Sequence, residues 1–288
     1  MLDIKIDTVK KTIESRGYAR VIVLLPAGVM ARVGDLLDVI PEPVFLSNPC
    51  YGACDVPAHL LEKFKADAIF NFGHSRPKGI HYPGNVHFFE VQVKDEIPEF
   101  VPDFKRVGLV YVIQYKDTFG GYAEFLKNSG KKVVKGGTPD FMATYDSQVT
   151  GCDIGAAREV ADEVDGFVVV SDGLFHANAV AALGKPTFNW FGERAEAPKF
   201  PMAALFTAKK IAILTGIKPG QNYQKEAKRA QKKLEEMGKE VIMVAGDVIT
   251  PEISNFSVDF WITAACPRIP EDAYVSPSAP VREVLKYL

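Results

Sequence analysis

The chain has 288 residues, enough for two or three small domains, since a domain takes roughly 100–200 residues. Hydrophobic residues make up 47% and charged residues 24%, and the net charge of −2 argues against nucleic acid or an anionic membrane as partner. No stretch approaches the roughly 20 apolar residues that span a bilayer, and no apolar signal core begins the chain, so we expect a cytoplasmic protein.

Short β-branched runs that follow a basic residue recur along the chain, at residues 20–25, 106–113 and 210–217. Continuous apolar runs of this length predict strands buried on both faces, as in a parallel sheet. Further strands are expected at 44–46, 68–72, 131–135, 166–171, 186–190, 240–245 and 258–263, and helices at about 118–128, 154–163, 174–183 and 221–236. Strands that alternate with helices indicate βαβ units and therefore an α/β fold with mostly parallel sheets.

Proline-containing stretches at 97–102 and 197–201 divide the chain into three α/β segments. We therefore expect domains at 1–103, 104–205 and 206–288. The basic run from Lys225 to Lys233 has the spacing of a solvated helix face, which fits it better than a nucleic-acid-binding patch.

Each expected segment carries one cysteine at a point where a strand ends or a helix begins: Cys54, Cys152 and Cys266. A single cysteine in a protein is more often a small buried hydrophobe than a ligand. These three are flanked by Gly, Asp and Pro instead of core residues, and ligands of open α/β sheets bind at the carboxyl ends of strands. The set therefore indicates a metal or redox site.

Soft thiolates select zinc, copper(I) or an iron–sulfur cluster. Structural zinc sites usually have four ligands and paired C-x-x-C knuckles, which this chain lacks. Three thiolates around a 4Fe-4S cluster would leave one iron open for a small molecule. Cys50 lies in a C-x3-C pair with Cys54, but no third cysteine follows at the spacing of a C-x3-C-x2-C loop. We therefore expect Cys50 to be a structural thiol near the site and not a ligand.

The sequence resembles the compact archaeal form of 2-(3-amino-3-carboxypropyl)histidine synthase, the first enzyme of diphthamide biosynthesis. The matching motifs occur in the family's order: Tyr51–Asp55 (YGACD), Phe72–Ser75 (FGHS), Gly151–Asp153 (GCD), Ser171–His176 (SDGLFH) and Cys266–Ile269 (CPRI). The resemblance implies three similar α/β domains around a central 4Fe-4S cluster, with Cys54, Cys152 and Cys266 as its ligands. The chain departs from the family at Asn189–Phe191, where Asp-Pro is usual, and at Gln114–Tyr115, where Gln-His is common.

The activity that the resemblance implies is transfer of a 3-amino-3-carboxypropyl group from S-adenosylmethionine to a histidine of translation elongation factor 2. The reduced cluster would cleave the bond between sulfur and the γ-carbon in a noncanonical radical reaction. The family also implies an external electron donor and a homodimer.

Seven further residues are candidates for substrate binding, and most of them could instead have a purely structural role. The backbone amides of Ser171, Asp172 and Gly173 could bind the carboxylate of S-adenosylmethionine, or the side chains could simply cap the next helix. The other four are His74, Gln114, His176 and Arg268, of which Arg268 could hold a carboxylate or offset cluster charge and the two histidines could be structural.

Two rival functions stand beside this one. Quinolinate synthase also places three α/β domains around a 4Fe-4S cluster, as a dehydratase that needs no S-adenosylmethionine. A non-catalytic three-lobed protein, either a ligand-binding module or a regulatory subunit with a structural metal, is the rival from another class. The YGAC and CPR loops favour the transferase.

Overall fold

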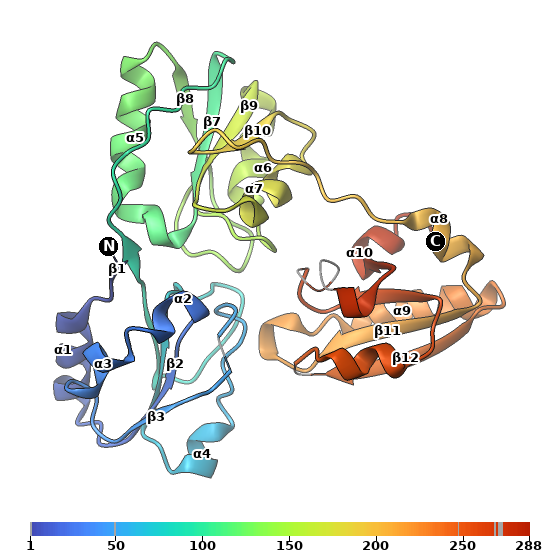
Figure 1. The fold of residues 1–288 in the computed structure, drawn as a ribbon, viewed down its shortest axis with the longest axis horizontal. Helices are drawn as coiled ribbons and strands as arrows, with labels where there is room; N and C mark the ends of the chain where they lie inside the picture. Colours follow the sequence, from blue (N-terminus) through green and yellow to red (C-terminus); the bar gives the residue numbers. More distant parts are fainter. Residues whose placement is uncertain (1, 49, 247, 268, 270–272) are drawn as a thin grey trace. The chain divides into compact units, whose positions relative to one another are not determined.

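The structure is a computed structural model that describes residues 2–48, 50–246, 248–267, 269 and 273–288. The chain divides into two compact units, Met1–Pro198 and Lys199–Leu288. The first unit holds two four-stranded sheets and the second unit holds a third (Figure 1). The α/β fold with parallel sheets is thus confirmed, and the boundary between the units falls in the expected proline stretch at 197–201.

The three sheets share one topology, in which all strands are parallel and the spatial order is second, first, third, fourth. The first sheet contains β2 (Val21–Leu24), β3 (Pro43–Phe45), β4 (Ala68–Phe72) and β5 (Val86–Phe89). The second contains β7 (Arg106–Tyr111), β8 (Lys132–Lys135), β9 (Gly166–Val170) and β10 (Thr187–Asn189). The third contains β11 (Lys210–Gly216), β12 (Glu240–Gly246), β13 (Phe260–Ala264) and β14 (Ser278–Pro280).

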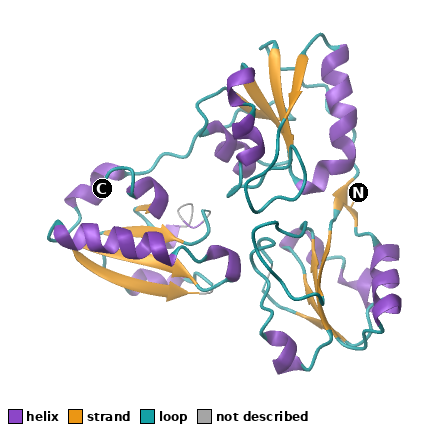
Figure 2. Ribbon diagram, turned by 180° about the vertical axis from the view of Figure 1, so that it is seen from behind, coloured by secondary structure: helices purple, strands orange, loops and turns teal. Residues whose placement is uncertain are grey.

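Helices cover the sheets (Figure 2), and each sheet has a buried apolar cluster on both faces. This explains why the central strands read as continuous apolar runs, since a strand buried on both sides has no polar face. The helices are α1 (Ile6–Arg16), α2 (Ala27–Met30), α3 (Val33–Leu37), α4 (Leu60–Phe64), α5 (Lys116–Asn128), α6 (Gly155–Glu159), α7 (Leu174–Ala181), α8 (Met202–Thr207), α9 (Gln224–Glu236) and α10 (Val281–Val284). None of the helices in the described ranges is both long and apolar enough to cross a membrane.

A short antiparallel ladder pairs the N-terminus with the segment between the first and second sheets. It pairs β1 (Leu2–Asp3) with β6 (Gln92–Val93). Gln92 donates to the Ile113 carbonyl at 2.9 Å and accepts from the backbone N–H of Asp117 at 3.3 Å, at the beginning of α5. The first two sheets are therefore tied together within the first unit.

An aspartate clasp recurs at the amino edge of every sheet. The residue directly before the third strand of each sheet is an aspartate, whose carboxylate accepts backbone N–H groups at the start of the first strand, at 2.7–2.8 Å. The aspartate N–H in turn donates to the carbonyl of the basic residue there, at 2.9 Å. The pairs are Asp67 with Arg20, Asp165 with Arg106 and Asp259 with Lys210. At the start of the first strand, the shared bonds use backbone groups alone; the basic side chain also bonds to the aspartate in the second sheet, where Arg106 pairs with Asp165 at 2.6 Å.

We expect these clasps to make stability depend on pH. Backbone hydrogen bonds to Asp67 and Asp259, and the Arg106 side chain beside Asp165, hold the pKa of each carboxyl below its usual range. Because the folded pKa is lowered, the stabilisation is full above the unfolded pKa of about 4 and is lost as the pH falls through the folded pKa. Urea unfolding from pH 7 downward should show a shallower acid loss in the triple Asp→Asn variant; an unchanged slope would contradict the clasp.

Candidate functional site

The carboxyl edge of each sheet holds most of the residues singled out in the sequence. In this strand order the first and third strands are neighbours, and the connections that follow them run to opposite sides. In sheets of this kind, ligands usually bind in the crevice beyond the carboxyl ends of these two strands. His74 follows the third strand of the first sheet, and Ser171–Gly173 follow the third strand of the second. Gln114 follows the first strand of the second sheet, and Cys266 follows the third strand of the third.

Cys54 is half-buried in the loop between β3 and α4. The hydroxyl of Tyr82 donates to the Ala53 carbonyl at 2.7 Å and so fixes the residue before it. A side chain at Gly52 would place its Cβ 3.3 Å from the Cys54 sulfur, so the glycine leaves the thiol room. The loop therefore presents Cys54 from a defined backbone.

Cys50 belongs to a buried polar chain behind this loop. Its sulfur accepts from Asn71 Nδ2 at 3.1 Å and donates to the Gly52 carbonyl at 3.2 Å. Asn71 is fully buried within β4, and its Oδ1 lies 2.9 Å from Nδ1 of His74. Because Asn71 donates with Nδ2 and accepts with Oδ1, this arrangement places the His74 proton on Nδ1.

The His74 ring is neutral at physiological pH. Burial lowers its pKa to about 4, and the nearby Phe72 backbone offsets part of that effect. A neutral ring with its proton on Nδ1 has a lone pair on Nε2, which makes His74 a hydrogen-bond acceptor at the carboxyl edge of the first sheet.

Cys152 lies in a tight turn directly before α6 and is half-buried. Its sulfur is 3.3 Å from Thr150 Oγ1, and Thr150 and Asp153 exchange backbone hydrogen bonds around it. The Asp153 carboxylate is buried and accepts five backbone N–H groups. They come from Asp140, Phe141, Met142, Ala143 and Gly155, at 2.6–3.2 Å. Burial raises the pKa of Asp153, but these hydrogen bonds outweigh it and hold the pKa below its usual value.

The beginning of α7 packs on the Cys152 turn. A Cβ on Gly151 would lie 2.2 Å from the Phe175 ring, so the glycine lets the two segments approach closely. Ser171 donates to the Gly173 carbonyl at 2.9 Å, and α7 has no side-chain cap. The simple capping role for Ser171 or Asp172 is thus not seen. His176 lies in the first turn of α7, with its ring edge-on to Phe175.

Gln114 links the two sheets of the first unit, because its Nε2 donates to the Gly73 carbonyl at 2.8 Å, next to His74. In the second unit Cys266 is half-buried beyond β13. The neighbouring Ala265 lies 3.2 Å from where a Gly216 Cβ would be, at the end of β11. Arg268 falls outside the described residues. Among the described residues, no three His, Cys, Asp or Glu side chains converge on one point.

Comparison with known proteins gives the family. The model of the diphthamide synthesis protein family matches residues 28–193 and 198–281, which is most of the chain. The chain belongs to the diphthamide synthesis protein family. Two similar curated members are both named 2-(3-amino-3-carboxypropyl)histidine synthase. The one from Pyrococcus horikoshii is 27% identical, over 94% of this chain and 85% of its own length. The one from Methanocaldococcus jannaschii is 24% identical, over 98% and 87%.

Solved structures from this family show the same fold. Dph2 from Pyrococcus horikoshii superposes with a TM-score of 0.82 at 22% identity, over 99% of this chain and 90% of that one. A second crystal structure of that protein, with a 4Fe-4S cluster, also has a TM-score of 0.82, at 21% identity and over 100% and 92% of the two chains.

Three residues important to the site's construction were not predicted: Asn71, Tyr82 and Asp153. Asn71 is a polar residue in the middle of an apolar strand, which is a signal that it has a buried hydrogen-bond partner. Asp153 directly follows a cysteine, and the sequence pattern indicated only a turn there. Tyr82 gives no signal in the sequence, because its partner is a backbone carbonyl 29 residues away.

The turn held by Asp153 leaves no space at Gly155. A Cβ there would lie 2.6 Å from the backbone nitrogen of Asp140. We expect Gly155→Ala to lower the free energy of unfolding by about 1–3 kcal/mol, because backbone cannot yield as a flexible side chain can. Gly120→Ala is the matched control, since that exposed site in α5 is open and alanine should stabilise the helix by about 0.5–1 kcal/mol. Urea unfolding that gave both variants the same sign would contradict this packing.

Proposed function

We propose that the protein transfers the 3-amino-3-carboxypropyl group of S-adenosylmethionine to a histidine of translation elongation factor 2, the first step of diphthamide synthesis. The observation that carries the proposal is the match of the family model to most of the chain, with the family's motifs at the carboxyl edges of the sheets. The similar proteins are named as synthases of 2-(3-amino-3-carboxypropyl)histidine.

We propose Cys54, Cys152 and Cys266 as ligands of a 4Fe-4S cluster. All three are half-buried cysteines in loops beyond strand ends, and three sulfur donors fit an iron–sulfur cluster better than a hard cation. A cluster bound in this way supplies one electron and one open iron position for a substrate. Each ligand then comes from one sheet with its flanking helices, which supports domains bounded near residues 103 and 205.

The remaining candidate residues would bind and orient the substrate. The start of α7 suits the carboxylate of S-adenosylmethionine, because the N–H groups and the positive dipole end of a helix N-terminus favour an anion. Neutral His74 offers an acceptor, and the Gln114 side chain is held beside it by Gly73. Which of the three C–S bonds breaks would then depend on how these groups pose the sulfonium. His176 and Arg268 stay candidates for the same pocket.

The reaction needs further partners. These are elongation factor 2 as the protein substrate, an external electron donor and, following the family, a second copy of the chain in a homodimer.

The products of the cleavage test the proposed function. The anaerobically reconstituted protein, incubated with dithionite and S-adenosylmethionine, should release 5′-methylthioadenosine. Release of 5′-deoxyadenosine without 5′-methylthioadenosine would refute cleavage of the sulfur–γ-carbon bond. Absence of both products, in protein that takes up no iron, would refute the function as a whole.

A further inference from the structure

Residues 73–82 connect the loops of two proposed cluster ligands. On one side, Tyr82 holds the Ala53 carbonyl beside Cys54, and His74 is bound through Asn71 to Cys50 in the same loop. On the other side, this segment faces the second sheet. We refer to residues 73–82 as the bridge segment.

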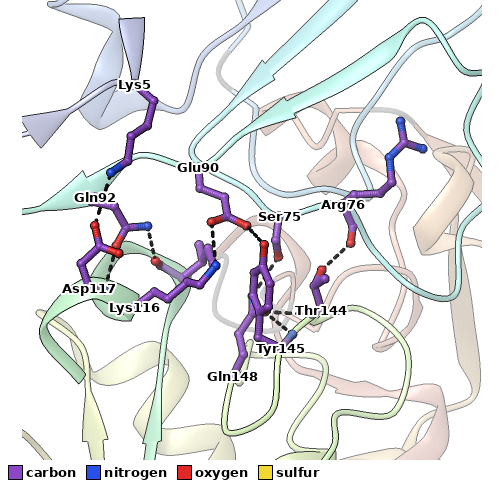
Figure 3. A network of polar contacts seen from close by, with 11 residues as sticks. Lys5, Ser75, Arg76, Glu90, Gln92, Lys116, Asp117, Thr144, Tyr145 and Gln148 are labelled. Carbon is purple, nitrogen blue, oxygen red and sulfur yellow. Dashed lines mark hydrogen bonds and ion pairs between the residues drawn. The ribbon is translucent and has the colours of Figure 1, made fainter. Parts of the chain in front are cut away.

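The bridge segment meets the second sheet through residues 141–148. The N–H of Gly79 donates to the Phe141 carbonyl at 2.7 Å, and Thr144 donates to the Arg76 carbonyl. Gln148 Nε2 donates to the Ser75 hydroxyl at 2.9 Å, with both side chains buried. Figure 3 shows Thr144 and Gln148 facing the bridge segment across this boundary.

A charged cluster lies beside these bonds. The Tyr145 hydroxyl donates to Glu90 at 2.6 Å, and the Lys116 ammonium lies 3.4 Å both from Glu90 and from the centre of the Tyr145 ring (Figure 3). Contacts of this kind hold the two sheets in one orientation, because a partly buried charge that moves away from its partner is left poorly solvated.

The turn that carries these contacts is folded around Asp153. Four consecutive amides, from Asp140 to Ala143, converge on its buried carboxylate, and Gln148 Oε1 accepts the next two N–H groups, from Thr144 and Tyr145. The Asp153 backbone meanwhile closes the turn that contains Cys152. One residue therefore holds both the Cys152 turn and the surface that grips the bridge segment.

We propose that Asp153 is a positioning residue that, through the bridge segment, sets the distance between Cys152 and Cys54. The inference rests on the proposed function, which makes these two cysteines ligands of one cluster. Asp153 touches neither substrate nor cluster in this role; it acts through the backbone. The first unit would thus present two thiolates as a preassembled pair.

The test uses the full chain without metal. The chain has four cysteines, so Cys50→Ser together with Cys266→Ser leaves only Cys54 and Cys152. Dibromobimane, a short reagent that fluoresces when both arms have reacted with thiols, should link them in this parent protein. Adding Asp153→Asn should slow linking by roughly tenfold or more. The asparagine side chain is neutral, and its NH2 group cannot accept the hydrogen bonds that one carboxylate oxygen accepted from the backbone amides. Asp165→Asn, at the amino edge of the same sheet, should leave the rate unchanged.

A second variant separates positioning from loss of folding. Ser75→Ala with Tyr145→Phe keeps every amide bond to Asp153 but removes two contacts between the sheets, and it should also slow linking. If Asp153→Asn slows linking but the Ser75→Ala, Tyr145→Phe variant does not, the role of the bridge segment is overturned. If the Asp153→Asn variant links as fast as the parent protein, the whole proposal is overturned. A parent protein that does not link overturns it as well. Wild-type protein that takes up no cluster, while the parent links normally, would refute the proposed function only.

Discussion

Replacing Cys54, Cys152 or Cys266 with alanine, one at a time, is expected to abolish cluster binding, whereas Cys50→Ala retains it. A cluster held by three thiolates already has one iron without a cysteine ligand, so each single replacement leaves two such irons and weakens binding of the cluster. Cys50 is instead committed to Asn71 and to the Gly52 carbonyl. Iron and sulfide per chain after anaerobic reconstitution measure the difference.

The Cys50 variant is the matched control, because it removes a thiol from the same loop as Cys54. Circular dichroism of all four variants checks that loss of iron is not loss of fold. Full iron content in any of the three ligand variants, or loss of iron only in Cys50→Ala, would contradict the assignment.

Asn71→Leu is expected to lower the free energy of unfolding by about 2–4 kcal/mol. Leucine branches at Cγ as asparagine does, so the main effect is that the His74 N–H loses its acceptor and the Cys50 sulfur loses its donor, at a position where Asn71 is fully buried. A buried polar group left without a partner costs about 1–3 kcal/mol. Urea unfolding at pH 7 measures this, where His74 is neutral.

A double-mutant cycle isolates the buried pair. Asn71→Leu combined with His74→Leu removes both partners and should cost less than the sum of the two single variants. Additive losses would show that Asn71 and His74 do not act together, and that the hydrogen bond at 2.9 Å contributes no coupling.

Strands buried on both faces, such as β4 and β9, were predicted well, but so were β8 and β12, which are partly exposed. The expected strand at 68–72 matches β4, and 131–135 and 166–171 match β8 and β9 to within one residue. The run at 106–113 ends at Tyr111 instead, because Ile113–Tyr115 turn into a 3-10 helix before α5. The strands missed are β1, β5, β6 and β14. Most of these have two or three residues, too few to show a hydrophobic pattern.

Helix ends were less predictable than strands. The expected helix at 154–163 is interrupted at Val160, between α6 and a 3-10 turn at Ala161–Glu163. Periodicity does not reveal such a break, because Ala156, Ala157 and Val160 are buried in one apolar cluster and Ala161 packs against it. The start of α9 at Gln224 lies three residues after the expected start, since Pro219–Gln221 form a separate turn.

The candidate site was predictable where chemistry is local and not where it depends on distant backbone. Cysteines beside Gly, Asp and Pro indicated loops at strand ends, and the three lie in such loops. Asp153 was interpreted only as evidence for a turn, yet its carboxylate is buried and satisfied by amides 10–13 residues earlier. A sequence pattern carries no information about which backbone amides will converge on a carboxylate.

The most direct test of the central claim is the mass of elongation factor 2 after reaction. Archaeal elongation factor 2 is incubated anaerobically with the reconstituted protein, S-adenosylmethionine and dithionite, then digested and analysed by tandem mass spectrometry. The proposed function predicts one histidine that gains a single 3-amino-3-carboxypropyl group on a ring carbon, and no gain with the Cys266→Ala variant. An unmodified factor, from protein that holds its cluster and binds S-adenosylmethionine, would contradict it.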